Sequence, residues 1–264
     1  ARGMIIKMEI KQISNFQAIA LILIIVTNHL ILGTPRTLIA ETGTGTILNM
    51  IYVFILALLL VFIITKLFSN FNGKDIIDIS EFLGGKVLKV IVGIVFIIYF
   101  LVILSTTVRV IVQDLEIIYF QNISVYVLTL AILASIVFVY KYGSSAVVKC
   151  NSIIAPIVGI AILIIAFSNV QDFSLDRIFP ILGFGAKETF ITGASNIFAY
   201  SGLAILYFIM PMLKDSKNFK KVSIVSTILV GILIVGSVSS LVLSFPFIEN
   251  INEISSLYVE SRDI

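Results

Sequence analysis

The chain has 264 residues, of which 59% are hydrophobic and only 12% are charged, and its mean hydropathy is +1.14. Soluble domains are about 45–50% apolar and about 25% charged, so we expect lipid to be the main solvent of this chain. The net charge of +3 comes from dispersed basic residues, which argues against nucleic-acid binding. The single cysteine, Cys150, excludes an internal disulfide and a multi-cysteine metal site.

Apolar runs long enough to cross about 30 Å of hydrocarbon recur along the chain. They show no alternation of period two, and only helices or closed barrels satisfy the backbone in lipid. We therefore predict an all-α integral membrane protein in which residues 1–264 form a single transmembrane domain. The seven predicted transmembrane helices cover residues 12–41, 46–66, 87–113, 122–140, 146–169, 188–213 and 221–247.

The charges of the connecting segments predict how these helices are oriented. With the N-terminus in the cytoplasm, the inner segments hold 13 of the 18 basic residues and only 5 of the 15 acidic ones. Basic residues that flank membrane helices favour the cytoplasmic side. One inner segment, Lys74–Lys86, places apolar residues at helical spacing opposite Asp75, Asp78 and Glu81. It predicts a short helix in the cytoplasmic interface that ends at Gly84-Gly85.

The first span carries a polar interruption. A continuous helix over residues 12–41 would be about 45 Å long, which is too long for one untilted crossing. Thr27, Asn28 and His29 lie near its midpoint, and His29 is the only histidine of the chain. We predict that the helix breaks at these three residues, with Pro35 early in the second half-helix.

The sixth span has the same character, because Ala199, Tyr200, Ser201 and Gly202 stand at the centre of its apolar run. Interrupted helices at corresponding positions of two halves indicate the binding site of a transporter-type fold. We therefore expect both interruptions to lack i→i−4 hydrogen bonds and to face each other near the middle of the membrane.

Five stretches carry a resemblance to a known family: "KQISNFQAIALILI" from Lys11, the segment around Pro35, "DIIDISEFLGGKVLKVI" from Asp75, "FPILGFGAKETFITGASNIFAYSG" from Phe179 and "MPMLKD" from Met210. The chain resembles the spore-germination permeases, the B subunits of nutrient germinant receptors, in the amino acid–polyamine–organocation superfamily. The resemblance implies a five-plus-five inverted repeat, with residues 1–170 as the first repeat and 171–264 as a partial second repeat. Because the family has ten spans, the chain corresponds to a fold truncated after helix seven.

The sequence also departs from this family at both interruptions. Asn28 stands where the family usually has glycine, and Leu203 and Ala204 stand where a glutamate is common. The resemblance implies a nutrient-sensing subunit in the bacterial cytoplasmic membrane or the spore inner membrane. It also implies two partners, a large soluble-domain subunit and a lipoprotein subunit. Two alternatives remain, namely a secondary transporter of amino acids or other small polar solutes, and an inactive partial chain.

We expect a small polar nutrient, such as an amino acid, to bind between helices one and six. Backbone N–H groups at the start of a half-helix suit a carboxylate. The predicted ligand-binding residues are Thr27, Asn28 and His29 on one wall and Ala199, Tyr200, Ser201 and Gly202 on the other.

Other polar groups are given no part in the predicted site. The hydroxyls of Tyr99, Ser105 and Thr106 on the third span are expected to bond to their own helix. The chain shows no nucleophile–base pair, phosphate-binding loop or metal-ligand spacing, so we predict no enzyme activity, cofactor or metal.

The predicted orientation can be tested by labelling single cysteines from outside the cell, in a chain that carries Cys150→Ser. We expect an impermeant thiol reagent to label Ser174→Cys and to leave Lys217→Cys unlabelled until the membrane is opened, because the charge distribution places position 174 outside. Labelling of position 217 in intact cells, or no labelling of position 174, would contradict this topology.

Overall fold

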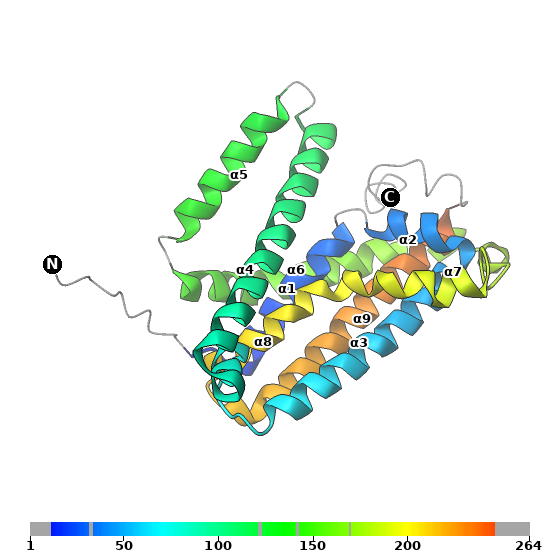
Figure 1. Cartoon of the computed structure of the whole chain (residues 1–264). Helices are drawn as coiled ribbons and strands as arrows, with labels where there is room; N and C mark the ends of the chain where they lie inside the picture. Colours follow the sequence, from blue (N-terminus) through cyan, green and yellow to red (C-terminus); the bar gives the residue numbers. More distant parts are fainter. Residues whose placement is uncertain (1–11, 32–33, 121–122, 141–142, 169, 246–264) are drawn as a thin grey trace.

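The computed structural model describes residues 12–31, 34–120, 123–140, 143–168 and 170–245. Figure 1 shows these residues as a body of packed helices. The C-terminal part of α4 (Ile76–Ile118) and all of α5 (Val125–Tyr140) extend away from this body. Within the described residues, the bridge between Ile13 and Leu213 is the only β-type pairing. The prediction of an all-α membrane protein is confirmed, since five described stretches are long and apolar enough to cross a bilayer. Two shorter apolar helices, Asn15–Asn28 and Val125–Val139, accompany them.

Four helices lie within three residues of the predicted spans at both ends: α3 (Thr46–Phe68), α5 (Val125–Tyr140), α6 (Ser144–Ser168) and α9 (Phe219–Ser244). Their long charge-free runs explain the agreement, because backbone groups in lipid must bond within the segment. The sixth span consists of α7 (Ala186–Phe190), η4 (Thr192–Ile205), α8 (Leu206–Ile209) and η5 (Met210–Met212). Short 3₁₀ turns in the connections are η1 (Gly43–Gly45), η2 (Val170–Asp172), η3 (Leu175–Ile178) and η6 (Ser216–Asn218).

The predicted interfacial helix and the third span form one element, α4 (Ile76–Ile118). The carboxylate of Asp75 caps its start by accepting a hydrogen bond from Asp78 N over 2.8 Å. Gly84 and Gly85 have non-helical backbone angles, and Gly85 has a φ of 67°. The predicted end of the interfacial helix is therefore a kink, after which the helix continues into the membrane span.

The predicted break at Thr27, Asn28 and His29 is wrong. α1 (Asn15–Ile31) passes through all three residues as an α-helix, and the chain resumes as α2 (Thr34–Thr42). The hydroxyl of Thr27 donates to the carbonyl oxygen of Leu23 over 2.7 Å, a bond within one helix turn that lets a polar residue stay helical in an apolar setting. Pro35 lies in the first turn of α2 as expected, where its missing N–H costs little.

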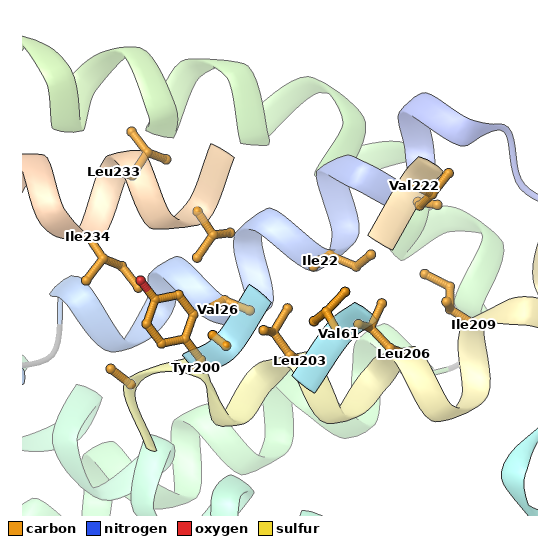
Figure 2. Close-up of a cluster of buried hydrophobic side chains, with 14 of the residues drawn as sticks. Ile22, Val26, Val61, Tyr200, Leu203, Leu206, Ile209, Val222, Leu233 and Ile234 are labelled. Atoms are coloured by element: carbon orange, nitrogen blue, oxygen red, sulfur yellow. The ribbon is translucent and has the colours of Figure 1, made fainter. Parts of the chain in front are cut away.

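The main core joins α1, α3 and α9 to the sixth span. Among its fully buried side chains are Ile22 of α1, Met50 of α3, Leu206 of α8 and Ile234 of α9. Figure 2 shows Ile22, Leu206 and Ile234 within this cluster. By contrast, most apolar side chains of α4 and α5 are exposed, which suits helices that face lipid.

The segment before α7 is held against the turn between α2 and α3. Thr44 Oγ1 donates to the carbonyl oxygen of Pro180 over 2.6 Å, and Thr189 Oγ1 donates to that of Leu182 over 2.9 Å. Gly183, with a φ of 55°, lies so close to this turn that a Cβ there would overlap the carbonyl oxygen of Thr42. Glycine is therefore required at position 183 both by its backbone angle and by space.

We expect Gly183→Ala to destabilise the protein by roughly 3 kcal/mol or more, because strain at a positive φ adds to the overlap with Thr42. Gly73→Ala is the matched control, since Gly73 also has a positive φ of 74° but nothing lies within 4 Å of the place that a Cβ would take there. It should cost only about 1 kcal/mol. Unfolding of the purified variants in detergent measures both losses, and equal losses would show that the contact with Thr42 does not matter.

Candidate functional site

The sixth span is interrupted, but it is tightened rather than unwound. From Thr192 to Ile205 the chain forms a 14-residue 3₁₀ helix, η4, between the short α-helices α7 and α8. Runs of 3₁₀ helix longer than about four residues are uncommon and often mark a hinge or a strained segment. The span thus departs from α-helix at Tyr200–Gly202, where the sequence predicted missing i→i−4 hydrogen bonds, and it does so as a 3₁₀ helix.

η4 crosses α1 at a close contact that depends on Gly202. A Cβ on Gly202 would lie 2.9 Å from Ile25 Cγ2 and 3.1 Å from the carbonyl oxygen of Ile25. Small residues allow this kind of approach between membrane helices. The two polar stretches predicted for spans one and six therefore do lie near each other, because Thr27 follows Val26, which is also at this contact.

Tyr200 points away from the membrane-exposed side of η4 and into the core. Tyr200 is 3% exposed, its ring stacks on Phe54 of α3 at a centroid distance of 6.5 Å, and it lies beside Ile234 of α9 in Figure 2. Its hydroxyl has no hydrogen-bond partner within the described part of the chain. A buried hydroxyl without a partner costs about 1–3 kcal/mol, so this conformation leaves one polar group of the interrupted span unsatisfied.

The transition from α7 to η4 is held by a buried pair of asparagines. Asn49 of α3 donates through Nδ2 to the carbonyl oxygens of Thr189 over 2.6 Å and Gly193 over 2.9 Å. Asn196 of η4 donates in turn to Asn49 Oδ1 over 2.9 Å. Backbone groups at a change of helix type need partners of this kind when no water is present. We call these four residues the asparagine clamp.

A cavity of about 580 Å³ lies between α2, α4 and η4. Glu41 is the only charged residue among those that line it, and Thr37 lies one helix turn before Glu41 on the same face of α2. From α4, the hydroxyl of Tyr99 donates to the carbonyl oxygen of Ser201 over 2.8 Å. The lining residues are Thr37, Leu38, Glu41, Tyr99, Val102, Ile103, Thr106, Ser195, Asn196, Phe198, Ala199 and Ser201. The arrangement provides one anionic group, several hydroxyls and an irregular backbone, which are the groups that recognise a small polar molecule.

The residues predicted for the ligand site fall into three groups. Ala199 and Ser201 line the cavity, whereas Tyr200 and Gly202 face the core and α1. On α1, Thr27 is buried and bonded to its own helix, and Asn28 is half-buried. The side chain of His29 lies outside the described residues. The two predicted sets of ligand residues therefore lie near each other only where Gly202 contacts α1. The cavity lies beside this contact and includes only Ala199 and Ser201 of the predicted residues.

Sequence reasoning missed the contributions of Glu41, Asn49 and Tyr99. Asn49 is the only amide within the predicted span 46–66, and a lone polar residue in such a run is a signal that could have been used. Tyr99 was expected to bond to its own helix, which is wrong, although Ser105 and Thr106 do so through the carbonyl oxygens of Leu101 and Val102.

The chain is similar to proteins of known kind over most of its length. The family model described as "Spore germination protein" matches residues 12–251. Spore germination protein B2 of Bacillus subtilis (strain 168) is 22% identical over 250 residues, which cover 89% of this chain and 67% of that protein. Spore germination protein YndE of the same organism is 24% identical over 210 residues, covering 77% of this chain and 58% of that protein. The chain thus spans about two thirds or less of these relatives' length.

We expect Asn49→Leu to destabilise the protein by about 2 kcal/mol or more, because it leaves the two carbonyl groups and Asn196 without partners in a dry interior. Asn151→Leu is the control, since Asn151 is a half-buried asparagine of α6 far from the clamp in sequence. Denaturation of the purified chain in detergent measures both. Similar losses for the two variants would contradict a specific role for Asn49.

Proposed function

We propose, from the premise that the chain belongs to the spore germination protein family, that it is the ligand-sensing membrane subunit of a receptor that triggers germination. It is a multi-pass membrane protein, and its relatives are spore germination proteins by name. The observation that supports a sensing role most directly is the cavity beside the interrupted sixth span, with Glu41 as its single charged group.

The chemistry of the cavity favours a zwitterionic amino acid. The carboxylate of Glu41 would pair with the ligand's ammonium group, and such charge-assisted hydrogen bonds are stronger than those between neutral groups. Thr37 lies one turn closer to the N-terminus of α2, where the helix dipole favours a carboxylate. A small α-amino acid carries both groups on one carbon atom and could therefore contact both residues of α2 at once.

Binding would be read through the interrupted span. A ligand shifts a conformational equilibrium only if it binds one state better than the other. In this conformation Ser201 is tied to α4 by the bond from Tyr99, while the Tyr200 hydroxyl is buried without a partner among the described residues. A rotation of this part of η4 would alter both, and partner subunits would sense the change. We propose a large soluble-domain subunit and a lipoprotein as those partners, and a cytoplasmic N-terminus in the cytoplasmic or spore inner membrane.

The second candidate function is secondary transport of amino acids or other small polar solutes. A cavity next to an interrupted membrane-spanning helix is also the arrangement of many transporters. We also propose that residues 1–170 form one repeat and residues 171–264 a partial second repeat, and this division is compatible with either function. Net movement of labelled amino acid separates the two.

We expect Glu41→Gln, introduced into the full receptor assembly in spores, to raise the amino-acid concentration for half-maximal germination about tenfold or more. Glu116→Gln is the matched control, because this carboxylate of α4 is also predicted on the outer side but does not line the cavity. Unchanged sensitivity of Glu41→Gln at normal protein level would contradict the site. Uptake of labelled amino acid by the chain without its partner subunits would favour the transporter instead.

A further inference from the structure

A second cavity, of about 460 Å³, lies at the lysine-rich end of the helix body, between the end of α3 and the start of α9. Lys66 of α3 and Lys217 and Lys220 from the start of α9 and its preceding turn bring three ammonium groups to it. No carboxylate is among the described residues that line it, whereas Ser69 and Asn72 add hydrogen-bonding groups. This composition suits an anion.

No ion pair within the described part of the protein involves the ammonium groups of this lysine cavity. The only ion pair among the described residues joins Lys89 to Glu81 on α4. Asp215 is the acidic residue nearest in sequence, and its carboxylate accepts from Lys217 N over 3.0 Å and Asn218 Nδ2 over 3.2 Å, so it caps the turn η6. No side chain caps the N-terminus of α9, whose dipole adds positive potential at the same place.

The cavity also has an apolar side, which is exposed at the surface of the helix body. Phe62 of α3 lines it and is 48% exposed on a helix that spans the bilayer. The ammonium group of Lys220 lies 5.2 Å from the centre of the Phe62 ring, which holds this lysine at the boundary between the apolar and the basic side. A free phosphate would gain nothing from Phe62, whereas a phospholipid presents an anionic headgroup next to hydrocarbon.

We propose that the lysine cavity binds the headgroup of an anionic phospholipid, with the phosphate among Lys66, Lys217 and Lys220 and the acyl chains along Phe62. Basic pockets between membrane helices on the cytoplasmic side recognise such headgroups. Met210, in the last turn of the sixth span, also lines the cavity, so a bound lipid would join α3, α9 and the sixth span. This site is independent of the proposed function, because it does not include the Glu41 cavity.

The test is lipid retention by the purified full chain. The protein is incubated in detergent with equal amounts of phosphatidylglycerol and phosphatidylcholine, and the bound lipid is measured by native mass spectrometry. Each lysine near an anionic headgroup contributes a gain of roughly fivefold, so Lys217→Gln with Lys220→Gln should weaken phosphatidylglycerol binding about 25-fold. Lys86→Gln with Lys149→Gln is the charge-matched control, because both lysines are exposed and lie outside the cavity.

The expected result is a preference for phosphatidylglycerol that the first pair of substitutions abolishes and the second pair leaves unchanged. Circular dichroism and gel filtration confirm that both variants fold. Equal losses in the two pairs would indicate general attraction of charges and overturn the site. Equal retention of both lipids would overturn it as well. If inorganic phosphate at millimolar concentration displaces the lipid completely, the cavity is a site for a free anion and the proposal of a lipid is wrong.

Discussion

The hydrogen bonds that Asn49 donates to Thr189 and Gly193 are the interaction on which the architecture of the candidate site depends. In a membrane interior, a helix can change its type only if other protein groups satisfy the backbone that the change releases. At the junction of α7 and η4, α3 supplies this group with the side chain of Asn49. Asn196 donates the remaining hydrogen bond, to the side-chain oxygen of Asn49. Because Gly193 has no side chain, Asn49 can approach the backbone closely. The 3₁₀ form of the sixth span is therefore a property of α3 as well as of its own sequence.

The tightened helix in turn creates the space beside it. A 3₁₀ helix rises about 2.0 Å per residue and is narrower than an α-helix, so its side chains occupy a smaller cross-section. On one side η4 presses against α1 at Gly202, and on the other the hydrogen bond from Tyr99 to Ser201 links it to α4. The cavity lies on this second side, where a long side chain reaches across from α4 to the backbone of η4.

The helical membrane fold could be predicted from the sequence because spans in lipid are set by apolar length, which is local information. The kink at Gly84-Gly85 and the position of Pro35 were likewise visible as local signals. The break at Thr27–His29 was predicted wrongly from such local signals. The three polar residues stay helical, and the hydroxyl of Thr27 bonds to the carbonyl oxygen of Leu23 one turn earlier. Tyr99 and Asn49 were missed for the opposite reason, since their partners lie 102 and about 140 residues away in sequence. Long-range hydrogen bonds of this kind leave no periodic pattern in the chain.

The constraints on the sixth span indicate which part of it can respond to a ligand. Its start is held by the asparagine clamp, and its end is fixed by Ile13, which donates to Met212 O over 2.8 Å and accepts from Lys214 N over 3.1 Å. Between these ends, Gly202 is pressed against α1. Residues 197–201 lie between the clamp and this contact, and Phe198, Ala199 and Ser201 among them line the Glu41 cavity.

This stretch lies between the held ends of the span, and a bound amino acid would touch it directly. A change at Ser201 would reach α4 through its hydrogen bond with Tyr99, whereas a change at Tyr200 would reach α3 and α9 through the core. Through these two contacts, a short segment could couple occupancy of the cavity to the packing of α3, α4 and α9 without a large motion of the whole span.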